Sequence, residues 1–282
     1  MAQTVKKPRI YINIPEWLAS TGTVIDPVFY TLPVSPSAII DVPDTSAVTI
    51  PANKACIAIL GHQLTDVTIN AIVQSGGVIN GDFGSGVIGG FSIAELNELP
   101  TAITLEGGTG EAGSILLGTF YDFPHSPDLN LSLSYSYDGI KETTTKGGAT
   151  LTNSFYTKPP AWGTLGAWEL GGTAAHAKSG RRIWDLSFSY LADSSVFPDN
   201  AGLVNEDSND TTTLTLLEDD SFQRVIHLTN GGQIPFIFQP DNTSGSEKPD
   251  SFAIAKFDMK SFKFSQVSMN TYNCKIRIKE IW

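Results

Sequence analysis

Hydrophobic and polar residues alternate most regularly in the last hundred residues of the chain. From Arg181 to Leu191 nearly every second residue is apolar or aromatic, and the stretch from Tyr272 to Trp282 repeats the pattern. A period of two predicts antiparallel strands with one buried and one solvated face. The large residues on these apolar faces, and on that of 234–238, are the candidate core or interface anchors: Trp184, Phe188, Tyr190, Phe236, Phe238, Tyr272 and Trp282.

Two more strands are expected between these, at Phe222 to Leu228 and at Ile234 to Phe238. The connecting residues 229–232 read Thr-Asn-Gly-Gly, and Asn-Gly supplies the positive φ angles of a tight hairpin. The C-terminal part of the chain is therefore predicted to hold one packed β core.

Shorter strand patterns occupy the first half. Residues 9–14 alternate and end at Pro15, after which 16–19 fit a single helical turn. The apolar run 55–60 fits a strand buried on both faces, with 67–73 as its expected neighbour, and 115–121 forms another strand.

Residues 129–137 alternate and are followed by Asp138-Gly139, a strong signal for a hairpin with 140–145 as partner. The one short helix is expected at 91–99, with Ser92 and Glu95 forming a capping box.

The remaining segments are expected to be irregular. Five prolines break Asp26 to Pro51 into extended pieces that wrap a surface, and seven glycines between 75 and 90 indicate a surface loop. No Gly-Lys-Ser/Thr element follows these glycines, which argues against a phosphate-binding loop. Residues 153–180 are interpreted as a long connection packed by its own aromatic residues, and 200–213 as a solvated polar loop.

Together these patterns predict an all-β, antiparallel protein with very little helix, built as two β-sandwiches of jelly-roll or galectin-like type. The boundary is placed near residue 120. Residues 1–120 form the N-terminal sandwich with the proline-rich segment and the glycine-rich loop, and 121–282 form the C-terminal sandwich, with interleaving of strands allowed.

Charge narrows the choice of partner. The formal net charge is -11, which argues against binding to nucleic acid because that needs a basic surface. Residues 192–250 carry eleven acids and two bases (2 − 11 = −9), whereas 251–282 carry six bases and two acids (6 − 2 = +4). The basic end is therefore suited to an acidic neighbour. The sequence shows no run of signal-peptide or bilayer-spanning length, so we expect synthesis in the cytoplasm and no membrane insertion.

No residue pattern indicates a metal, cofactor or catalytic site. The histidines lack the spacing of a metal motif, and the cysteines lie in apolar runs that favour buried thiols, with a disulfide left open: His62, His125, His176, His227, Cys56 and Cys274.

Carboxylates and tryptophans leave rival interpretations open. Asp138, Asp185 and Glu142 are the residues that a glycoside-cleaving site would use, but a turn and a polar strand face account for the first two. The acids Glu206, Asp207 and Asp210 lack the regular pattern of a calcium loop. Tryptophans at 162, 168, 184 and 282 suit a sugar-stacking platform as well as a core, and strand periodicity favours the core.

Three blocks of this sequence resemble the C-terminal part of tailed-phage tail and baseplate structural proteins: Trp184 to Leu191, Asn230 to Asp241, and Tyr272 to Trp282. The stretch 58–64, Ala-Ile-Leu-Gly-His-Gln-Leu, resembles a segment that precedes them in similar virion proteins of marine and cyanobacterial phages. The layouts most similar to this order belong to distal tail proteins and tail-tip adaptors or hubs. The polar stretch 200–213 departs from this pattern.

The resemblance implies a non-enzymatic structural role in the virion, in the tail tip or baseplate, through homo-oligomerisation as a trimer or hexamer and contacts with other tail proteins. Two alternatives remain: a carbohydrate-binding module of a phage fibre, which would take a host-surface glycan, and a capsid decoration protein. A glycan-cleaving enzyme is the rival from another class. Assembly predicts that Trp184 and Trp282 are buried in the core or between subunits, and that the proline-rich segment lies on another chain.

Overall fold

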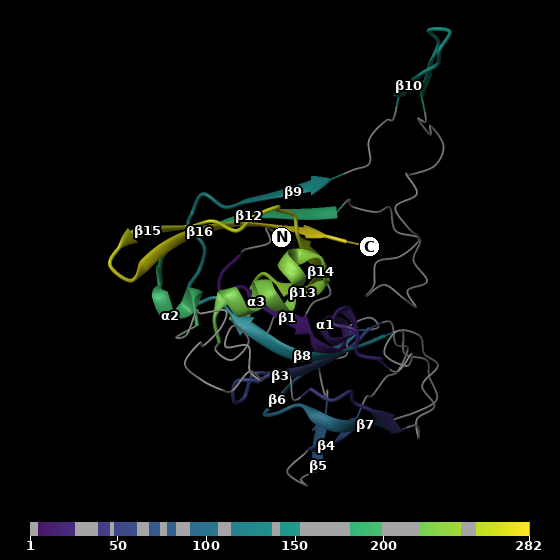
Figure 1. Ribbon diagram of the computed structural model, residues 1–282, viewed down its shortest axis with the longest axis vertical. Coiled ribbons are helices and arrows are strands. Elements are labelled where there is room, and N and C mark those ends of the chain that lie inside the picture. Colours follow the sequence, from purple (N-terminus) through teal and green to yellow (C-terminus); the bar gives the residue numbers. More distant parts are fainter. Residues whose placement is uncertain are drawn as a thin grey trace.

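A computed structural model describes residues 5–25, 39–45, 48–60, 68–73, 78–82, 91–106, 114–136, 142–152, 181–198, 220–243 and 252–281, and strands dominate these ranges (Figure 1). The helical elements are α1 (Ile14–Ser20), α2 (Asp193–Val196), α3 (Phe222–Leu228) and the short 3-10 helix η4 (Asn230–Gly232). The strands are β1 (Arg9–Asn13), β2 (Ile39–Asp41), β3 (Ala55–Leu60), β4 (Thr68–Val73), β5 (Val78–Asp82), β6 (Phe91–Leu96), β7 (Pro100–Glu106), β8 (Ser114–Asp122), β9 (Ser132–Ser136), β10 (Glu142–Thr144), β11 (Thr150–Thr152), β12 (Arg181–Ala192), β13 (Phe236–Gln239), β14 (Ala253–Phe257), β15 (Phe264–Ser268) and β16 (Thr271–Glu280). The predicted all-β, antiparallel class with little helix is confirmed.

One antiparallel sheet of ten strands organises the molecule. Its order is β6-β3-β8-β1-β13-β14-β16-β12-β9, and β15 pairs with β16 beside this path. A second sheet has the order β2-β7-β4-β5, and β10 and β11 pair separately. The N-terminal strand β1 lies between β8 and β13, so strands from both halves of the sequence share one sheet. The boundary expected near residue 120 falls inside β8.

The large sheet folds into two layers with helices at the level between them. Figure 1 shows β9, β12, β15 and β16 in one layer and β3, β6 and β8 in the other, with α1 and α3 at the level between. Phe222 of α3 joins the layers, because its ring lies 5.9 Å from that of Tyr121 and 6.1 Å from that of Phe264. Phe123 and Phe188 stack at 4.4 Å, which links the end of β8 to β12.

Local sequence explains several of these elements. Pro15 stands in the first turn of α1, where its missing N–H costs nothing, and β1 ends there. β3 is buried along nearly its whole length, as its continuous apolar run predicted, and it pairs with β6 along one edge and with β8 along the other. Cys56 and Cys274 are buried free thiols, which confirms the simpler of the two interpretations.

Three elements differ in type from the sequence prediction. Residues 78–82, within the expected glycine-rich loop, form strand β5, which pairs with β4. Residues 222–228 form helix α3 and not a strand, because Phe222, Val225 and Leu228 recur at helical spacing on the buried face and Ser221 caps the helix. The Asn-Gly pair then ends the helix with positive φ angles and makes no hairpin. Conversely, 91–96 form strand β6 and not a helix, since they pair along their whole length with β3.

Two pairings also differ. β4 pairs with β5 and β7 in the four-stranded sheet and not with β3. β9 pairs with β12, and β10 pairs with β11, so the strand 140–145 is not the partner of 129–137. The Asp138-Gly139 turn lies outside the described residues, as do 153–180 and 200–213.

Candidate functional site: a polar cluster and two surface features

Polar side chains converge on Asp122 at the end of β8. The register places Arg9 of β1 directly opposite Asp122, and the Arg9 Nε donates to its Oδ1 at 2.6 Å. Lys54, just before β3, donates from Nζ to Oδ2 at 2.7 Å, and Asn242, beyond β13, donates from Nδ2 to Oδ1 at 2.6 Å. The cluster therefore ties together three adjacent strands and the segment after a fourth.

Both cations of this cluster lie close to an aromatic ring. The Arg9 guanidinium carbon lies 4.1 Å and the Lys54 Nζ 4.8 Å from the centroid of the Phe120 ring. Arg9 also forms an ion pair with Glu95 of β6, while the Tyr11 hydroxyl donates to Oε1 of Gln239 at 2.8 Å. These contacts combine charge with ring stacking, which suits a partly buried guanidinium.

The electrostatics indicate a structural cluster. Burial alone would raise the pKa of Asp122, but hydrogen bonds from Arg9 and Lys54 outweigh it and hold that pKa below its ordinary value. Burial works against a charged Arg9, yet its bond to Asp122 keeps the Arg9 pKa above the ordinary value. Proton transfer at neutral pH is most efficient for groups that titrate nearby. A carboxylate held ionised by three donors is better suited to joining strands than to acting as a base.

A second feature is an exposed apolar corner beside the β15–β16 hairpin. The register of β12 against β16 shifts between Phe188 and Leu191, and that of β15 shifts between Gln266 and Ser268, so two bulges flank the same part of β16. We call Tyr190, Val267 and Met269 the bulge corner; their exposed fractions are 76%, 47% and 85%.

Tyr190 has an unusual backbone. Its φ is +59°, and its N–H donates to Oδ1 of Asn273 at 3.0 Å. A tyrosine in the left-handed region costs about 1 to 2 kcal/mol, and such outliers gather where structure serves function. The bulge turns Tyr190 away from the core face and brings Leu191 into it. The predicted shared face of residues 184–190 is therefore wrong at Tyr190.

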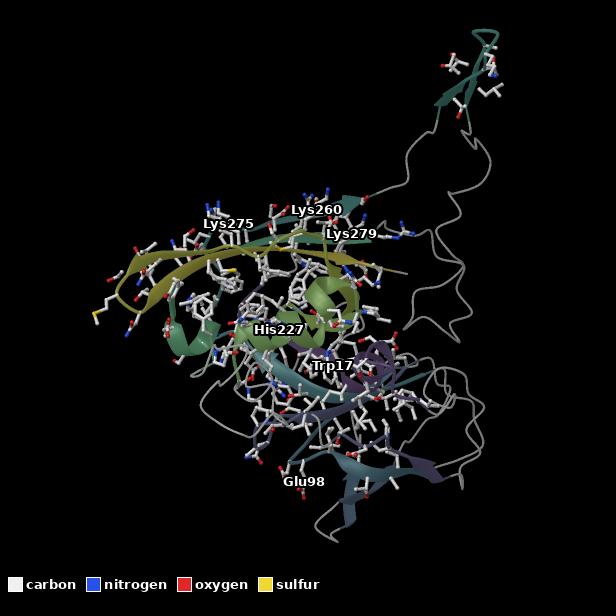
Figure 2. All side chains as sticks on the ribbon, in the orientation of Figure 1. Trp17, Glu98, His227, Lys260, Lys275 and Lys279 are labelled. Atoms are coloured by element: carbon white, nitrogen blue, oxygen red, sulfur yellow. The ribbon has the colours of Figure 1, made fainter. Side chains whose placement is uncertain are left out.

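A third feature is the outer surface of the upper layer. We define the basic face as Lys256, Lys260, Lys275, Arg277 and Lys279, and Figure 2 labels three of its lysines along that layer. The register pairs Lys256 with Lys279 across β14 and β16. Arg277 lies 3.5 Å from Asp185 and 3.6 Å from Asp258. The lysines form no ion pair with any described residue, so the face keeps a positive charge.

The other predicted anchors occupy different environments. Trp184, Phe188, Phe236 and Phe238 are buried, and the rings of Trp184 and Phe238 meet edge to face at 5.1 Å. Tyr272 is partly exposed, with its ring 5.1 Å from that of Phe197. Trp282 lies outside the described residues.

Within the described ranges, the candidate catalytic and metal-binding residues do not lie together in one site. His125 lies in the connection between β8 and β9, whereas His227 lies in α3, where burial lowers the pKa of His227. Asp185 accepts from Ser132 Oγ at 3.4 Å and faces Arg277. Within the described ranges, no three His, Cys, Asp or Glu residues are placed to hold a metal ion.

Several candidates could not be compared with the structure, because they or their side chains lie outside its description: His62, His176, Asp138, Glu142, Glu206, Asp207, Asp210, Trp162 and Trp168. Sequence reasoning also missed the Asp122 cluster. The available signal was a few isolated charged residues beside apolar strands, at positions 9, 54 and 122. Charged side chains are rarely buried unless they pair with an opposite charge, so these residues could have been expected to form ion pairs.

None of the described helices has the length and apolar character needed to cross a membrane. No family model matches the chain, and neither the curated proteins nor the solved structures contain a significant match.

Proposed function

We propose that this protein is a structural component of a tailed-phage virion, located in the tail tip or baseplate, and that it acts by self-association and contacts with neighbouring tail proteins. The bulge corner is the observation that carries the proposal, because it presents large apolar groups to solvent beside two bulges of the sheet. The resemblance of the blocks around Trp184, Asn230 and Tyr272 to tail proteins supplies the setting.

Tyr190 has the properties of an interface anchor. Exposed tyrosines supply a large contact area at low cost in side-chain entropy and are enriched among the residues that dominate binding. The strained backbone at φ +59° aims the ring outward, and the exposed Met269, which follows β15 on the other side of β16, adapts readily to the shape of a partner. Burial of the corner against another subunit would remove this apolar area from water.

The rival functions fit the described residues less well. A sugar-binding platform would expose tryptophan, whereas Trp184 is buried and has the core position that an assembly role predicts. Glycoside cleavage needs two carboxylates facing each other, whereas Asp185 faces Arg277. A capsid decoration protein would use the same kind of exposed apolar surface. A position on the capsid therefore stays the alternative to a position in the tail.

The proposal is tested by light scattering of the purified chain over a range of concentrations. We expect a trimer or hexamer, the closed symmetric assemblies that the resemblance to tail proteins implies. Tyr190→Asn with Met269→Ser should raise the dissociation constant about tenfold or more, which corresponds to about 1.4 kcal/mol. Asparagine tolerates the left-handed backbone, so this variant removes the ring with little added strain.

Tyr135→Ser is the matched control, because Tyr135 is also an exposed tyrosine but lies on β9, away from the corner. The oligomeric mass and the dissociation constant of this control variant should equal those of the unaltered chain. A monomer at every concentration would contradict self-association, and binding to a glycan array would then favour the carbohydrate-binding alternative.

A further inference from the structure

Opposite charges gather at opposite ends of the molecule. The described stretches between residues 39 and 106 carry six acids and one lysine (1 − 6 = −5), whereas 252–281 carry six bases and two acids (6 − 2 = +4). Figure 2 shows Glu98 at one end of the described body and Lys260, Lys275 and Lys279 at the other. The strand order agrees, because β6 begins the large sheet and β14, β16 and β12 lie toward its far edge.

The acidic end has a defined structure. We call Asp44, Glu95 and Glu98 the acidic pole; all three residues are exposed, and Glu95 also forms the ion pair with Arg9. Two backbone hydrogen bonds, from Val42 to the Thr101 carbonyl and from Asn53 to the Asn97 carbonyl, hold the segment containing Asp44 beside residues 97–101. The three acidic residues therefore lie on connected backbone.

The basic face carries an electrostatic cost that the described fold does not offset. Lys256 and Lys279 are direct cross-strand neighbours, and like charges in this position destabilise a sheet. Arg277 is balanced by Asp185 and Asp258, but this leaves the lysines without an acidic partner among the described residues. An acidic surface docked on this face would relieve the repulsion.

We infer that the basic face of one copy binds the acidic pole of a second copy, head to tail. This inference rests on the proposed function, since it names the surfaces through which copies associate. The occupant is a second copy because each chain carries both surfaces at opposite ends and the charges match. Nucleic acid is disfavoured, since a chain with a net charge of -11 repels phosphates at long range.

The arrangement also predicts the type of assembly. Two basic faces repel each other, so a two-fold contact of face on face is excluded for this surface. A head-to-tail contact is heterologous, and its repetition gives a ring when the rotation closes and a filament when it does not. The bulge corner adjoins the basic face through β16 and extends the same contact with apolar groups.

The test uses two full-length variants that each neutralise one surface. The face variant is Lys275→Gln with Lys279→Gln, and the pole variant is Asp44→Asn with Glu98→Gln. Light scattering of each variant alone should give a monomer or a dissociation constant raised tenfold or more. An equimolar mixture should give a dimer and nothing larger, because only one intact face can meet one intact pole.

Two checks accompany this experiment. Lys146→Gln, an exposed lysine outside the basic face, should leave the assembly unchanged, and circular dichroism should show that every variant is folded. For the unaltered chain, the assembly should weaken between about 50 mM and 500 mM salt, since screening shortens the reach of exposed charges.

The outcomes separate the two proposals. If both single variants keep the full assembly mass, or if the pole variant alone still assembles normally, head-to-tail docking is overturned while self-association stands. If the unaltered chain is a monomer under all conditions, this inference and the proposed self-association fail together.

Discussion

At the crossing of β1 and β8, Gly118 leaves no room for a side chain. A Cβ at this position would lie far inside van der Waals contact with the Ile12 carbonyl oxygen and 3.2 Å from the Ile14 nitrogen. These neighbours are backbone atoms of β1, which joins both halves of the large sheet, and of the first residue of α1, so they cannot move without disturbing the pairing of β1. The glycine is required by close approach of the backbones, since no positive φ is involved.

Gly118→Ala should therefore destabilise the protein by about 3 kcal/mol, at the upper end of the usual cost of overpacking. The free energy of unfolding in urea measures this directly. Gly147→Ala is the control, because a Cβ there meets only the Thr145 hydroxyl at 4.0 Å. A loss at Gly118 no larger than that at Gly147 would show that β1 and β8 do not approach as closely as described.

Residues whose role depends on contacts between distant strands, as that of Gly118 does, could not be predicted from the sequence. The alternation of Trp184, Leu186 and Phe188 correctly placed them in the core, because each makes its contacts through a regular strand. Tyr190 broke the pattern, since a bulge depends on the register of two neighbouring strands and leaves no local signal. The ion pairs of Asp122 likewise depend on strands far apart in the sequence.

Helix α3 shows why element type is ambiguous for short apolar segments. Its seven residues contain apolar positions at both strand and helical spacing, and tertiary packing decides between them. Phe222 packs against rings from three strands, and Arg224 reaches the Thr49 carbonyl at 2.9 Å, contacts that only the helical arrangement provides. Sequence reasoning predicted the adjoining turn residues correctly but assigned them to a hairpin.

The cap of α3 gives a test of this element. The Ser221 side chain accepts from the Arg224 backbone N–H at 3.3 Å inside the core, so Ser221→Ala removes a buried cap bond. We expect a loss of about 1 kcal/mol in the free energy of unfolding, typical of an N-cap. Ser265→Ala, on an exposed position of β15, should change it by less than about 0.5 kcal/mol. Equal effects would contradict the cap.

At the scale of the whole molecule, the fold class followed from strand periodicity, but the connections between strands did not. Antiparallel pairing of β1 with β8 and β13 joins residues more than a hundred positions apart, which no local pattern encodes. The charge asymmetry of the last thirty residues was visible in the sequence. The spatial separation of these basic residues from the acidic pole could not be predicted without the strand order, because residues 39–106 and 252–281 reach opposite ends only after folding.

The shared sheet predicts that the chain unfolds as one unit and does not separate near residue 120. Removing 1–120 would take away β1 and most of β8, leaving β13 unpaired on one edge and the Phe123 and Phe188 rings without the layer that covers them. Calorimetry at a fixed protein concentration should therefore show one transition, with the calorimetric and van't Hoff enthalpies equal within error. The fragment 121–282 should lack the near-UV dichroism of packed aromatics. Two separate transitions, or a fragment with a native-like spectrum, would instead support two independent sandwiches.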